Sequence, residues 1–144
     1  LNDGDASISG IDIKTEVFTI KKILGLRSIY SVYDYSDQLS FSMQPLSILR
    51  NNILFKLGSF QAKITLKKEG RRVLSTINSL GELENNYLSD YQALDAHVSY
   101  AFSIGDYRAN ITIFGQNLND KSQVLQGVSI FDKRVFISVG FQWR

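Results

Sequence analysis

The chain of 144 residues contains no cysteine, one histidine and one proline. The lack of cysteine excludes a disulfide-stapled scaffold, a cysteine-ligated zinc or iron–sulfur site and a cysteine nucleophile. The single histidine, His97, excludes the clustered histidine ligands of common metalloenzymes. No apolar run reaches the roughly 18–20 residues that a membrane-spanning helix requires. The net charge of +2 is too small to indicate a protein that binds nucleic acid.

Apolar and polar residues alternate along most of the chain, and this period of two is typical of β-strands. In residues 11–17 the even positions are charged, whereas the odd positions include Ile11, Ile13 and Val17. The alternation returns over residues 60–67, 94–102, 107–113 and 134–143, and two less regular segments cover residues 24–35 and 48–57. The pattern predicts about seven strands of roughly 10–12 residues in one domain over residues 1–144.

Strand length and the character of the two faces favour a membrane barrel. Strands in globular proteins usually have about 5–6 residues, whereas a tilted strand that crosses a bilayer needs about 9–11. The apolar positions of the regular segments include no charged residue, but the alternate positions are ionic: Asp12, Lys14, Glu16, Arg27, Lys56, Lys63, Asp95, Arg108 and Arg134. In a transmembrane barrel the apolar face contacts lipid and the polar face lines a hydrated lumen. The expected fold is therefore all-β, an antiparallel transmembrane β-barrel segment.

The connections between the predicted strands alternate in length. Residues 20–23, 58–59 and 103–106 are short links, whereas residues 34–47, 68–90 and 117–133 are long ones. Outer-membrane barrels alternate tight periplasmic turns with extended extracellular loops in this way. Aromatic residues also gather at strand ends beside the short links, where such rings suit a bilayer interface: Tyr100, Phe102, Tyr107, Phe141 and Trp143.

Four segments carry a family resemblance. Residues 91–102 read YQALDAHVSYAF, residues 114–121 read FGQNLNDK, residues 135–143 alternate apolar and aromatic side chains, and residues 9–13 read SGIDI. They resemble, in this order, the Y-x-x-L-D-x-x-x-S-Y-x-F strand, the G-x-x-N-L-x-D-K segment, the C-terminal assembly signal and the G-x-E-hydrophobic strand start of TonB-dependent outer-membrane receptors. One departure is that Arg144 follows Trp143, whereas the family usually ends on Phe.

The resemblance implies a 22-stranded barrel with an N-terminal plug, located in the outer membrane of a Gram-negative bacterium. Seven strands do not close an antiparallel barrel with an even number of strands, and open edges are unfavourable in lipid. We therefore expect the chain to be the C-terminal wall segment of a larger barrel, without the plug and the N-terminal strands. Its implied partners are outer-membrane lipid and lipopolysaccharide, the remainder of the barrel and the plug, and the TonB complex through the missing N-terminal part.

Transport is the function that the resemblance implies: import of a scarce nutrient, such as a metal chelate, cobalamin or a glycan, with no cofactor. A passive porin-like channel is the first alternative. A soluble lipocalin-like barrel that binds an apolar ligand is a weaker one, because charges that line an apolar pocket are costly to desolvate. An enzymatic function is the least favoured of these alternatives.

Four short motifs are candidate functional sites. Asp95, His97 and Ser99 share one strand face, but neighbours two apart on a strand lie about 6.5–7 Å from each other, too far for the hydrogen bonds of a catalytic triad. Asn2-Asp3-Gly4-Asp5 resembles part of a calcium loop but lacks the distal acidic ligands, so a solvated turn is favoured. The basic run over residues 67–72 is expected to be a solvated loop tip rather than a site for anionic lipopolysaccharide or substrate. The sequon at Asn110 is expected to be silent on a bacterial strand.

Overall fold

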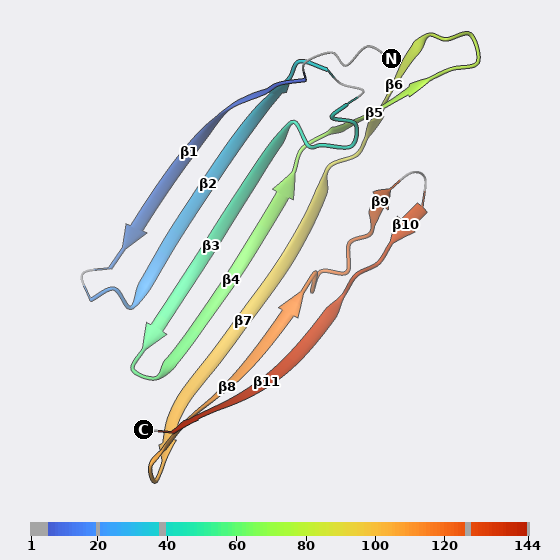
Figure 1. Ribbon diagram of the computed structural model, residues 1–144. Helices are drawn as coiled ribbons and strands as arrows, with labels where there is room; N and C mark the ends of the chain where they lie inside the picture. The colour runs from blue at the N-terminus through green and yellow to red at the C-terminus, as the bar shows by residue number, and fades with distance from the viewer. Residues whose placement is uncertain (1–5, 20, 38–39, 126–127, 144) are drawn as a thin grey trace.

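The computed structural model describes residues 6–19, 21–37, 40–125 and 128–143. Its main element is a seven-stranded antiparallel sheet in which the neighbours follow one another along the chain (Figure 1). The strands are β1 (Ile8–Phe18), β2 (Leu24–Tyr35), β3 (Ser47–Leu57), β4 (Phe60–Glu69), β7 (Tyr91–Ile104), β8 (Tyr107–Gln116) and β11 (Arg134–Trp143). The sheet is open, with β1 and β11 at its edges. The predicted all-β fold and its meander of about seven strands are confirmed.

The alternation of short and long connections is also confirmed. Short links join β1 to β2, β3 to β4 and β7 to β8 at one end of the sheet, and long links join β2 to β3, β4 to β7 and β8 to β11 at the other end (Figure 1). Gly58 and Gly105 each have a φ of 56° in their two-residue turns. Glycine adopts this left-handed backbone without the strain that a side chain adds, which makes such tight turns accessible.

Two of the long links contain hairpins, whereas the sequence predicts plain loops there. Strand β5 (Arg72–Ile77) pairs with β6 (Leu83–Leu88), and β9 (Gln123–Leu125) pairs with β10 (Val128–Ile130). Both hairpins extend beyond the end of the main sheet (Figure 1). Strands of six and three residues are too short for a period of two to stand out, which explains why the sequence did not reveal them.

The strand register divides the side chains between two faces, because directly paired residues point to the same side of a sheet. Ile64, for example, pairs with Ile53 on β3 and with Ala96 on β7. Large exposed hydrophobic residues cover this side, which we call the apolar face: Ile11, Ile13, Val17, Leu26, Val32, Ile53, Leu66, Val98, Ile111, Ile113, Ile137 and Val139. Within the seven described strands, Asp34 and Lys68 are its only charged residues, and both lie near the long links.

The opposite side, which we call the polar face, carries the ionic residues that the alternation predicts. The register puts all of them there: Asp12, Lys14, Glu16, Arg27, Lys56, Lys63, Asp95, Arg108 and Arg134. The two-sided character expected from the sequence is thus confirmed at the level of strand pairing.

The described part of the chain has almost no hydrophobic core. Its buried hydrophobic residues are Val73, Ala93 and Ala109, and no large side chain in it is fully buried. The accessible surface is 10474 Å², whereas a folded monomer of this mass exposes about 7,500 Å². Among the described residues there is no helix with the length and hydropathy needed to cross a membrane. The sheet therefore leaves a large apolar surface without a protein partner in this chain.

Candidate functional site

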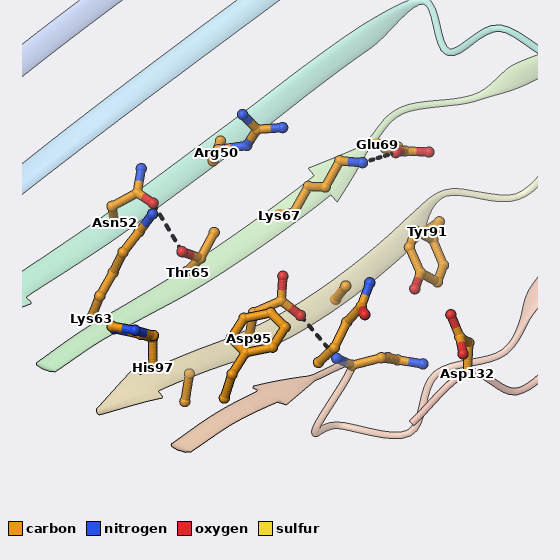
Figure 2. A pocket seen from close by; sticks show the side chains of 15 residues that line it. Arg50, Asn52, Lys63, Thr65, Lys67, Glu69, Tyr91, Asp95, His97 and Asp132 are labelled. Carbon is orange, nitrogen blue, oxygen red and sulfur yellow. Dashed lines mark hydrogen bonds and ion pairs between the residues drawn. The ribbon is translucent and has the colours of Figure 1, made fainter. Parts of the chain in front are cut away.

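A hollow with a volume of about 850 Å³ lies on the polar face of the described residues. Strands β3, β4, β7 and β8 supply most of its lining, and residues after β8 complete it (Figure 2). Cations, carboxylates and aromatic rings share this surface, among them Arg50, Lys63, Asp95, Asp132, Tyr91 and Phe114. Because alternate residues of each strand point here, the same periodicity that makes the other face apolar fills this hollow with polar groups.

Neutral hydrogen-bonding side chains line the middle of the hollow. Asn52 pairs with Thr65 across β3 and β4, and the Thr65 hydroxyl donates to Asn52 Oδ1 at 2.9 Å (Figure 2). On the next strand Asp95 lies opposite Thr65, and its carboxylate accepts the Asn117 backbone N–H at 2.8 Å. The Asp95 carboxylate thus holds the chain in position after β8.

The row of Asp95, His97 and Ser99 lies on the polar face, as the alternation predicts. His97 is paired with Lys63 on β4 and with Phe114 on β8. No hydrogen bond joins the three residues in the part of the chain that the structure describes. The three residues thus lie in one row on the same face, as expected, and they are not joined by the hydrogen bonds of a catalytic triad.

The basic run at residues 67–72 differs from the solvated tip that the sequence predicts. The side chain of Arg72 is 5% exposed and that of Glu69 is 10% exposed, and the two form an ion pair. Lys67 also pairs with Glu69 (Figure 2), and Lys68 pairs with Asp90 at 3.2 Å on the other side of β4. The predicted solvated tip fits Lys68 and Arg71, which are exposed, but not Glu69 and Arg72, which are buried where residues 43–47 hydrogen-bond to the backbone of residues 70–73.

The Glu69 carboxylate is buried at the end of β4 and is held there by the two cations Lys67 and Arg72. The Arg72 guanidinium also stacks over the Tyr91 ring, 5.8 Å from its centroid. Arg72 therefore connects Glu69, at the end of β4, with Tyr91, at the start of β7.

A second structural feature, which the sequence did not reveal, is a turn over residues 117–121 that covers the free edge of β7. The pairing of β7 with β8 begins only at Ala96, so the residues before it have no β8 partner. Asn119 Oδ1 accepts the Leu94 N–H at 3.0 Å, and the Leu118 N–H donates to the Leu94 carbonyl at 2.7 Å. Asn117 Oδ1 and Nδ2 bond to the Lys121 backbone and close the turn. Residues 117–121 therefore supply Leu94 of β7 with the hydrogen bonds that β8 does not provide.

Aromatic rings gather on the apolar face at the end with the short links, as predicted. Tyr107 and Trp143 are directly paired, with ring centroids 4.9 Å apart in an edge-to-face arrangement. Tyr100 stacks on Phe102 at 5.9 Å. Trp143 is 68% exposed and Phe141 is 70% exposed. A belt of exposed rings along one end of an apolar surface suits a boundary between apolar and aqueous surroundings.

The remaining candidate motifs give no site. Asn2-Asp3-Gly4-Asp5 lies outside the described residues. Within the described ranges there is no group of three or more metal-ligating side chains. Asn110 lies on the polar face, packed against Gly140 of the neighbouring strand.

No protein-family model, curated protein or solved structure matches the chain.

Proposed function

We propose that the chain forms part of the wall of a TonB-dependent receptor, an outer-membrane β-barrel that imports a scarce nutrient such as a metal chelate, cobalamin or a glycan. In this proposal the apolar face contacts lipid and lipopolysaccharide, and the polar face lines the lumen. The edges β1 and β11 pair with the other strands of the barrel. The plug and the segment that contacts the TonB complex belong to the remainder of the protein.

The observation that carries the proposal is the exposed apolar face. Ile13 is 59% exposed, Ile137 is 71% exposed and Ile64 is 46% exposed, although all three lie within ordered strands. The chain exposes about 3,000 Å² more than a compact monomer of its size. A contiguous apolar surface of this extent marks contact with a partner or with lipid.

Strand dimensions support lipid as the partner. The seven strands have 10 to 14 residues. At a rise of about 3.4 Å per residue and a tilt of about 45°, strands of this length span about 24–34 Å, enough to cover an apolar band about 25 Å tall. Strands that pack only on another protein sheet are usually about half as long.

The hollow lies on the polar face, which favours a barrel with a hydrated interior over a lipocalin-like protein. In a lipocalin the apolar side chains point inward and surround the ligand. Here the apolar side chains are on the other side of the sheet from the hollow.

Cell fractionation tests the proposal. We expect the full-length protein to sediment with outer membranes, to resist extraction by high salt or carbonate, and to dissolve only in detergent. Recovery in the aqueous fraction without detergent would contradict it.

Transport assays separate the coupled receptor from the porin-like alternative. A TonB-dependent receptor loses uptake when the proton-motive force is collapsed or when TonB is deleted, whereas passive flux through a porin persists. The four segments that resemble the receptor family favour the first result.

A further inference from the structure

Two clusters of ion pairs lie on the polar face outside the middle of the hollow. Near the β1 edge, Glu16 forms ion pairs with Lys14 at 3.1 Å and with Arg27. At the upper end of β4, Glu69 pairs with Lys67 and Arg72. The carboxylates of these two clusters are therefore engaged with nearby cations and do not reach Arg50 or Lys63 in the hollow.

Every carboxylate that lines the hollow is already engaged. Glu69 holds Lys67 and Arg72, and Asp132 pairs with Arg134. Asp95 accepts the Asn117 N–H at 2.8 Å. None of the three makes an ion pair with Arg50 or Lys63.

Arg50 and Lys63 are exposed cations in the hollow and have no hydrogen-bond or ion-pair partner among the residues that the structure describes (Figure 2). The register places Arg50 directly opposite Lys67, a second cation. Like charges in directly opposed positions destabilise a sheet. An unfavourable charge arrangement of this kind, held in a concave site, is typical of functional positions.

We propose that this hollow binds an oxyanion group, a carboxylate, phosphate or sulfate, of a small solute. Arg50 presents a planar set of donors that matches an oxyanion, and Lys63 adds a point charge. Asn52 lies between them along the strands, and its amide nitrogen remains a neutral donor because its Oδ1 accepts the Thr65 hydroxyl. A volume of about 850 Å³ lies within the range of small-molecule sites. The inference rests on the proposed function, because it takes the hollow as part of the transport lumen.

Calorimetric titration of the full-length protein in detergent, with citrate and with inorganic phosphate as probes at low ionic strength, tests the site. We expect at least one probe to bind, and its affinity to fall as salt is added. Combining Arg50→Met with Lys63→Met should weaken binding at least tenfold, since charge-assisted hydrogen bonds contribute about that much each. Lys56→Met is the matched control, because Lys56 is an exposed lysine on the same face of β3 outside the hollow, and it should leave binding unchanged.

Three results would overturn the inference. The first is no binding of either probe to the unaltered protein, and the second is an equal loss in the Lys56→Met control. The third is a zero-length carbodiimide cross-link between Lys63 and a carboxylate elsewhere in the same protein, which would identify a polypeptide segment as the occupant. Fractionation is independent of these titrations. A protein that is membrane-embedded but binds no anion refutes this inference alone, and an aqueous protein refutes the proposed function.

Discussion

Replacement of Ile113 by arginine is the substitution whose effect most clearly distinguishes lipid from water at the apolar face. Ile113 pairs with Val98 on β7 and with Ile137 on β11, and it is 47% exposed. It lies six residues along β8 from Tyr107, the residue beside the short link. At a rise of about 3.4 Å and a tilt of about 45°, this corresponds to about 14 Å, near the middle of an apolar band about 25 Å tall.

An arginine at the middle of a lipid-facing band destabilises a barrel by about 2–4 kcal/mol. An exposed surface substitution in water changes the free energy of unfolding by about 0.5 kcal/mol or less. Thr112→Arg is the matched control, because Thr112 lies at the same depth on the polar face, between Ser99 and Ser138. We expect Ile113→Arg to lower stability by about 2–4 kcal/mol and Thr112→Arg to have a much smaller effect.

Urea unfolding of the full-length protein in phosphatidylcholine vesicles, followed by tryptophan fluorescence, measures both free energies. Equal effects of the two substitutions, or a loss below about 0.5 kcal/mol for Ile113→Arg, would refute the assignment of this face to lipid.

Three further predictions concern the ends of the sheet. Glu69→Gln removes the carboxylate that pairs with Lys67 and with the buried Arg72, and should cost about 3–5 kcal/mol at neutral pH. Asn119→Ala removes the acceptor of the Leu94 N–H and should speed hydrogen exchange at that amide, whereas Asn110→Ala should not. A double-mutant cycle of Tyr107→Ala and Trp143→Ala should give a coupling of about 0.5–1.5 kcal/mol.

Each of these predictions has a contradicting result. A cost below about 1 kcal/mol for Glu69→Gln at neutral pH would show that the buried ion pair does not stabilise this end of the sheet. Unchanged Leu94 exchange would remove the edge-covering role of Asn119. Additive effects of the two aromatic substitutions would mean that the rings do not interact.

The sequence predicted the sheet and its two faces because strict alternation needs no long-range information. The two-residue turn at Gly58 fixes the β3–β4 register, so the opposition of Arg50 and Lys67 follows from local sequence. The opposition of Lys63 and His97 does not follow, because a long link with its own hairpin separates β4 from β7 and leaves their register open. Periodicity also gave no indication of the turn at residues 117–121, because that turn hydrogen-bonds to backbone groups of β7 that have no partner on β8.

Site-directed spin labelling along β8 tests directly whether the apolar face contacts lipid, and residues 1–144 contain no native cysteine that would compete for the label. Labels at Ile111 and Ile113, in the full-length protein in vesicles, should collide with oxygen and be shielded from a water-soluble nickel reagent. Labels at Asn110 and Thr112 should show lower oxygen and higher nickel accessibility, which gives an alternation with a period of two. Equal nickel accessibility on both faces, or the reverse alternation, would contradict the proposal that the apolar face of this sheet contacts lipid.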